Sequence, residues 1–147
     1  MTDLEVGKLE QIGRTSNTDY YRLEEHIIVA MPRIGSFDTG ETARENVSFQ
    51  TNTFRSEGTP GVVVVFFDRM TGQDVDARRV YANEIDPQWL AGSALVGGTF
   101  LGRAMASFFM GLSRPRIPTR LFGKVEDAVR WGRKCLADHV KVLERAG

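Results

Sequence analysis

The sequence predicts an α/β fold with a small, mixed and largely parallel sheet, and three observations predict it. Residues 61–67 are rich in valine and phenylalanine and follow Pro60, which is typical of a strand buried on both faces. Residues 93–96 predict a second such strand, followed by a glycine turn and an apolar helix. The chain closes with an amphipathic helix at residues 124–144. Strands that alternate with helices in this way favour parallel pairing.

The N-terminal part predicts an antiparallel hairpin at the start of the sheet. Residues 20–23 and 27–34 are two short strand-like runs, and the polar residues between them have the spacing of a hairpin. Residues 1–15 show little pattern and predict a loose arm or an edge element.

About four helices are predicted. Asp38 and Glu41 have the spacing of a capping box, which indicates a surface helix. Asp74 or Asp76 would cap a shorter helix, and Asp86 closes it because the residue before a proline is disfavoured in the α region. The predicted helices cover residues 41–57, 76–85, 100–112 and 124–144, and a last strand covers residues 116–122.

Length and composition predict a single domain over residues 1–147 without a bulk electrostatic partner. The 19 basic and 19 acidic residues cancel, so no nucleic-acid partner is expected. Cys135 is the only cysteine and cannot form an internal disulfide, and the start of the chain lacks the features of a secretory signal. We therefore expect a cytoplasmic protein.

The apolar segment at residues 89–113 is too interrupted to predict a membrane span. Its one charge, Arg103, divides it into two pieces that are each shorter than the roughly 20 residues a span needs. Five glycines interrupt it further. The segment predicts a buried strand, a turn and a helix instead.

Three segments carry a resemblance to a known family. They are VVVVFFD before a short helix, SALVGG before an apolar helix, and IPTRLFGKVEDAVRWGRK near the end. With these segments the chain resembles the STAS-like domains, the anti-sigma-factor-antagonist-like group, over about residues 18–137. The resemblance implies a small mixed sheet packed with helices. It also implies a non-enzymatic role in protein interaction, ligand sensing or regulation.

Thr71 is the candidate phosphorylation site that this resemblance suggests. Members of the group that are switched by phosphorylation carry an Asp-Ser-Ser-Gly-like motif after the central strand, whereas this chain has no serine there. A phosphate on Thr71 would be favoured by a helix N-terminus but repelled by Asp74 and Asp76. The alternative is structural, with Thr71 and Gly72 as a turn and the aspartates as helix caps.

Residues that follow adjacent strand ends form a candidate ligand- or anion-binding site. Ligands gather at the carboxyl ends of parallel strands, and glycines let backbone N–H groups approach an anion. The glycine pair lacks the lysine and the spacing of a P-loop, and a packing turn is the alternative. The candidate residues are Asp68, Thr71, Gly97, Gly98 and Thr99.

The helix predicted at residues 100–112 is apolar around most of its circumference. It is therefore either a buried core helix or an interface, and burying every face is difficult in so small a domain. The sequence predicts dimerisation or an apolar ligand at this helix, and a protein partner for the chain as a whole. The candidate interface residues are Phe100, Met105, Phe108, Phe109 and Met110.

No motif in the sequence predicts catalysis, a metal or a cofactor. His26 and His139 lack metal-ligand spacing, and Ser93 is not in a nucleophile-elbow motif. We expect a non-enzymatic regulatory or protein-interaction module that self-associates. The alternative is a small-molecule- or anion-binding protein with a pocket at the carboxyl ends of the parallel strands.

Overall fold

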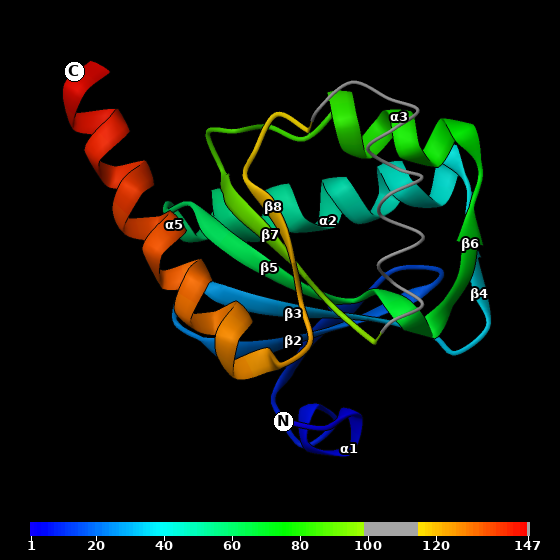
Figure 1. Ribbon diagram of the computed structural model, residues 1–147. Helices are drawn as coiled ribbons and strands as arrows, with labels where there is room; N and C mark the ends of the chain where they lie inside the picture. The colour runs from blue at the N-terminus through cyan, green and yellow to red at the C-terminus, as the bar shows by residue number, and fades with distance from the viewer. Residues whose placement is uncertain (99–114, 147) are drawn as a thin grey trace.

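Six strands form one mixed sheet in the computed structural model, which describes residues 1–98 and 115–146 (Figure 1). The order across the sheet is β1-β2-β3-β5-β7-β8. β1, β2 and β3 pair antiparallel, and β3, β5, β7 and β8 pair parallel. The predicted α/β class, with its N-terminal hairpin and parallel remainder, is confirmed. The strands are β1 (Gln11–Arg14), β2 (Thr18–Glu24), β3 (Ile27–Pro32), β5 (Gly61–Phe66), β7 (Leu90–Val96) and β8 (Thr119–Phe122).

The central strands are buried on both faces, as their apolar runs predict. Every residue of β3 and β7 is buried, and in β5 only Val65 is partly accessible. Helices cover both faces of the sheet, and a strand between two such layers has no solvent-facing side for polar residues. β5 ends one residue earlier than predicted, and β8 begins three residues later.

Helices lie on both faces of the sheet and form two layers in the described part of the chain (Figure 1). Residues of α2 (Gly40–Glu57) and α3 (Val75–Asn83) share a buried cluster with the Tyr20, Ile28 and Val63 face of the sheet. Residues of α5 (Val125–Ala146) share another cluster with the opposite face, around Val29, Val62 and Val64. With the short α1 (Asp3–Val6), the described residues contain four α-helices.

A second, two-stranded parallel sheet stands at the carboxyl ends of β3 and β5. It consists of β4 (Ser36–Asp38) and β6 (Met70–Gln73), and the 3-10 helix η1 (Phe67–Arg69) leads into β6. The predicted turn at Thr71-Gly72 is therefore wrong. Both residues belong to β6, which pairs with β4, a segment more than thirty residues away that no local pattern reveals.

Of the two helix caps predicted from the sequence, one is the predicted residue and the other lies one residue away. α2 is capped by Thr39, which forms a reciprocal capping box with Thr42, so the predicted Asp38–Glu41 box is wrong by one residue. Asp38 is the last residue of β4 instead, and its side chain points into the protein, where it is 1% exposed. Asp74 caps α3 through a 2.7 Å bond from the Ala77 N–H, which confirms one of the two predicted caps.

Residues 1–15 form an edge of the protein rather than a loose arm. β1 is the edge strand of the main sheet, and α1 buries Val6 completely. The amino group of Met1 lies 2.6 Å from the Glu126 carboxylate, and Asp3 pairs with Arg69 at 2.6 Å. Of the two predicted alternatives, the edge element is confirmed.

Candidate functional site

A cavity of about 80 Å³ lies between the sheet and the α2–α3 layer. Its apolar wall is provided mainly by sheet residues that include Ala30, Val63, Val65 and Leu95. Polar side chains from several elements face it as well, namely Tyr20, Asn46, Gln50, Gln73, Tyr81, Ser93 and Thr119. An apolar concavity with a few polar groups is the usual form of a small-molecule site.

The second sheet gives the cavity its wall at the carboxyl ends of the strands. Phe67 of η1 and Met70 and Gln73 of β6 line this side. β4 and β6 also lead directly into α2 and α3, and the Asp74 N–H donates to the Asp38 carbonyl at 3.0 Å. The two helices consequently begin side by side, next to the ends of β4 and β6 (Figure 1).

The carboxylate of Asp38 is the centre of a buried polar network beside the cavity. It accepts hydrogen bonds from the Asn17 amide at 3.2 Å and from the hydroxyls of Thr42 and Tyr81. Negative charge is favoured near the N-termini of helices, and two helices begin next to Asp38. These contacts explain how a carboxylate can be buried at this position.

The network continues from Asn17 to the cavity through side chains of β2 and α2. The side-chain amide of Asn46 donates to the side-chain amide oxygen of Asn17 at 2.9 Å, and its own oxygen accepts from the Tyr20 hydroxyl at 2.9 Å. The Gln50 amide in turn donates to the Tyr20 hydroxyl oxygen at 3.0 Å. Thr15 adds a 2.7 Å bond to Asn46. Gln50, Tyr20 and Asn46 all line the cavity, so the network reaches its surface.

Two tyrosines in this network are held in their neutral form. Burial raises the pKa of Tyr20, although its hydrogen bond with Gln50 opposes the shift. Burial also raises the pKa of Tyr81 well above its ordinary value, and the adjacent charge of Asp38 adds to that increase. Both phenols therefore act as hydrogen-bonding groups at neutral pH rather than as bases.

A comparison with protein families finds a match over most of the chain. The matching family model is described as "Domain of unknown function (DUF7793)" and covers residues 22–136. The chain belongs to this family. Searches of curated proteins and of solved structures found no match. The DUF7793 region contains Asp38, Tyr81 and most of the cavity wall, whereas Asn17 and Tyr20 precede it.

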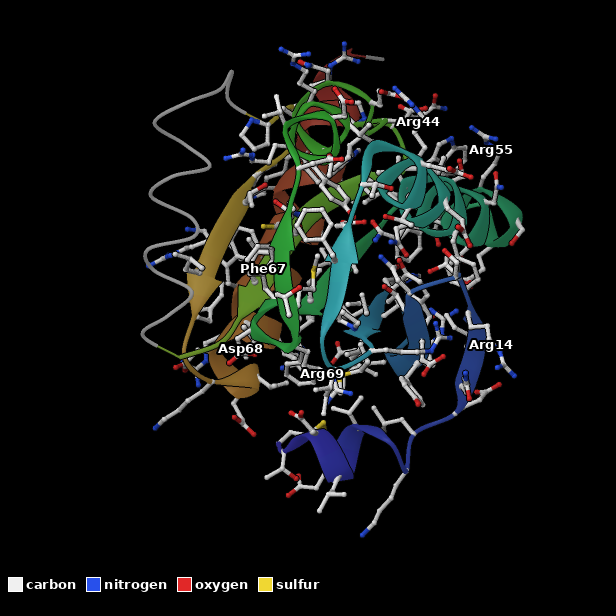
Figure 2. All side chains as sticks on the ribbon, turned by 90° about the vertical axis from the view of Figure 1, so that its right-hand side faces the viewer. Arg14, Arg44, Arg55, Phe67, Asp68 and Arg69 are labelled. Carbon is white, nitrogen blue, oxygen red and sulfur yellow. The ribbon has the colours of Figure 1, made fainter. Side chains whose placement is uncertain are left out.

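The structure brings together some of the residues predicted at the strand ends of the DUF7793 domain. Asp68 lies in η1 between Phe67 and Arg69 (Figure 2), and its carboxylate accepts a 3.3 Å hydrogen bond from the Gly98 N–H. Gly97 precedes that N–H on the same loop and donates to the Phe122 carbonyl. The Gly98 N–H, which the sequence predicts as an anion-binding donor, therefore already donates to the Asp68 carboxylate.

Thr71 lies apart from this contact. It is exposed on β6, and its hydroxyl donates to the Ser36 carbonyl at 3.1 Å. Thr99 and the five candidate interface residues, Phe100, Met105, Phe108, Phe109 and Met110, lie outside the described residues.

Cys135 and His139 on α5 serve the packing of the helix. Burial raises the pKa of the Cys135 thiol to about 11, so the thiol is protonated at neutral pH and is a poor nucleophile. His139 lies 2.7 Å from the Pro87 carbonyl through its Nε2 atom. In the described ranges no three His, Cys, Asp or Glu side chains are grouped so that they could hold a metal ion. No helix in that same part of the chain is both long and apolar enough to cross a membrane.

Sequence reasoning missed the Asp38 network and the cavity. One signal was available, because Thr42, Asn46 and Gln50 recur every four residues and therefore share one face of α2. Polar residues at that spacing indicate a buried polar stripe only if the face is known to meet the sheet. The partners Asn17 and Asp38 come from other elements, and their proximity depends on the tertiary fold.

Proposed function

We propose that this chain is a non-enzymatic regulatory module that binds a small molecule in the cavity between the sheet and the α2–α3 layer. The observation that carries the proposal is the cavity, in which apolar sheet residues face a polar network. The resemblance to STAS-like domains supports the regulatory part, because that group usually senses ligands or binds proteins without catalysis. The proposal retains the cytoplasmic location expected from the sequence.

The cavity is tested by admitting xenon, which enters apolar cavities in proteins. We expect xenon to shift the amide NMR signals of cavity-lining residues such as Val63, Val65 and Leu95 and to leave those of exposed residues unchanged. Ser93→Leu would fill the cavity and should abolish the shifts. Ser56→Leu makes the same chemical change at an exposed position of α2 and is the matched control. Xenon shifts that persist in Ser93→Leu, or that are absent from the unaltered protein, would contradict the cavity proposal.

Native mass spectrometry of the purified protein, followed by a denaturing spectrum of the same sample, tests whether the protein carries a natural ligand. An additional mass that disappears on denaturation supports a ligand acquired in the cell. That mass should be absent from Ser93→Leu and present in Ser56→Leu.

The same spectra test the self-association predicted for the helix at residues 100–112. A dimer mass supports this prediction. A monomer at all protein concentrations contradicts it and leaves ligand binding as the proposed function.

A further inference from the structure

The charge of Asp38 lacks a cationic partner in the described part of the protein. Asp38 is 1% exposed, and none of the ion pairs formed by the described residues includes it. Its three side-chain hydrogen bonds come from neutral donors, Asn17, Thr42 and Tyr81. Three converging donors are what an ionised carboxylate, which can only accept, requires.

This carboxylate sets the direction of every hydrogen bond between it and Gln50. Asn17 donates its amide hydrogens to Asp38, so its oxygen must accept from Asn46. The Asn46 oxygen must then accept from the Tyr20 hydroxyl, and the Tyr20 oxygen must accept from the Gln50 amide. All donors in this chain point toward Asp38, and the group left at the far end is the amide oxygen of Gln50.

The cavity therefore presents hydrogen-bond acceptors from this network. No described residue donates a hydrogen bond to the Gln50 amide oxygen. Tyr81 also lines the cavity, and its single proton is used by Asp38, so its oxygen offers only lone pairs. A ligand that placed another acceptor against these oxygens would bring lone pair against lone pair with no hydrogen between them, which is unfavourable. A ligand that donates hydrogen bonds would give a donor to both the Gln50 and the Tyr81 oxygen.

A protonated amine fits this site better than a neutral donor. An ammonium group carries three donors, and its charge is attracted by the Asp38 carboxylate more strongly in the interior than in water. A carboxylate ligand would meet repulsion from the same charge. The cavity of about 80 Å³ is about half the size of a roughly 150 Å³ cavity that accepts benzene, so it suits a short aliphatic body.

We propose that the cavity binds a small molecule that has a short apolar body and a protonated primary amine, and this proposal rests on the function proposed above. The apolar body lies against the sheet, near Val65 and Leu95. The ammonium group donates to the oxygens of Gln50 and Tyr81, at the end of the hydrogen-bond chain that leads to Asp38.

Three probes with the same carbon skeleton test this ligand class. They are isobutylammonium, isobutanol and isobutyrate, each titrated at pH 7 into isotope-labelled protein while the amide NMR signals of the cavity residues are followed. We expect isobutylammonium to bind at least tenfold more tightly than isobutanol and isobutyrate to cause no cavity shifts. Equal or tighter binding of isobutanol or isobutyrate would overturn the ligand class.

Two variants and a control test whether the preference comes from this network. Asp38→Asn removes the charge with little change in shape, and Tyr81→Phe removes one acceptor while Asp38 stays in place, which covers the case that Asp38→Asn does not fold. Each should reduce the preference for isobutylammonium over isobutanol at least fivefold. Glu41→Gln removes an exposed charge from the first turn of α2 and should leave the preference unchanged. An unchanged preference in Tyr81→Phe or a folded Asp38→Asn would overturn the proposal.

The xenon experiment separates this inference from the proposed function. If xenon enters the cavity but isobutylammonium has no advantage, the amine class is wrong and the cavity function stands. If neither xenon nor any of the three probes shifts the cavity signals, both proposals are wrong.

Discussion

Gly61 is a residue whose neighbour leaves no room for a side chain. A Cβ atom at this position would lie 2.0 Å from Cε1 of Phe54, which is completely buried in α2. Gly61 opens the central strand β5, so the packing of Phe54 of α2 against the start of this strand depends on the glycine. Its role is steric and does not depend on an unusual backbone conformation.

Gly61→Ala should lower the free energy of unfolding by about 1–3 kcal/mol, because the ring of Phe54 must move within a packed core. Urea unfolding followed by circular dichroism measures the change. Gly123→Ala is the control, since a Cβ atom there would meet nothing within 4 Å beyond its chain neighbours, and it should change stability by less than about 0.5 kcal/mol. Equal effects of the two variants would show that Phe54 does not restrict this position.

Asp38→Ala should lower the free energy of unfolding by about 3 kcal/mol or more. The substitution leaves the donors of Asn17, Thr42 and Tyr81 without their acceptor in a buried environment. Glu25→Ala, at a largely exposed carboxylate, should have an effect of less than about 0.5 kcal/mol. Similar urea midpoints for both variants would mean that water replaces Asp38 in the network.

At the scale of elements, the paired starts of α2 and α3 organise the candidate site. β4 and β6 lie parallel, and the N-cap residues Thr39 and Asp74 follow directly at their ends. This arrangement places two positive helix ends beside Asp38. Because β4 and β6 belong to distant parts of the sequence, each helix start depends on the other.

Asp74→Ala should destabilise the protein by about 1 kcal/mol, because the Ala77 N–H loses its 2.7 Å partner at the start of α3. Asp74→Asn retains an accepting oxygen and should lose less. Asp76→Ala, an exposed first-turn substitution without a cap bond, is the control and should cost no more than a few tenths of a kcal/mol. The urea midpoint should be lowest for Asp74→Ala and highest for Asp76→Ala. A control variant as unstable as Asp74→Ala would contradict the capping role.

At the scale of the whole molecule, an ion pair joins the N-terminal hairpin to the C-terminal helix. Arg133 of α5 forms two hydrogen bonds with the Glu24 carboxylate at the end of β2, at 2.7 and 3.0 Å. Hydrogen bonds from Arg133 lower the pKa of Glu24 below its ordinary value of 4.5, and its partial burial opposes the shift. The pair holds α5 against the antiparallel edge of the sheet.

The Glu24–Arg133 pair should contribute stability only where Glu24 is ionised. The folded-state pKa is lowered, so the contribution is present above pH 4.5 and is lost as the pH falls through the folded-state value. Arg133→Met should lower the free energy of unfolding at pH 7 only slightly, because Arg133 is largely exposed and an exposed ion pair stabilises a protein little. Urea unfolding at pH 7 and pH 3 measures the difference, which should shrink at the lower pH and in 1 M salt. A difference that is the same at both pH values would indicate lost packing instead.

The candidate site was less predictable than the fold, and the reason is physical. The sequence predicts Asp38 as a helix cap, because caps are recognised by residue spacing within one segment. In the structure the residue that caps α2 is Thr39, the next one along the chain. Its actual partners, Asn17 and Tyr81, lie 21 and 43 residues away. Neither separation produces a pattern in the sequence.

The sequence by itself determined the class of fold, the hairpin and the parallel central strands, because these depend on local apolar runs and turns. Gly61–Phe66 and Leu90–Val96 lack polar alternation, and this property alone indicates strands covered on both faces. Only the tertiary structure decided that β4 pairs with β6 and that Asp38 meets Asn17 and Tyr81 beside a cavity. Those contacts join distant segments, and they form only when the packed layers bring the segments together.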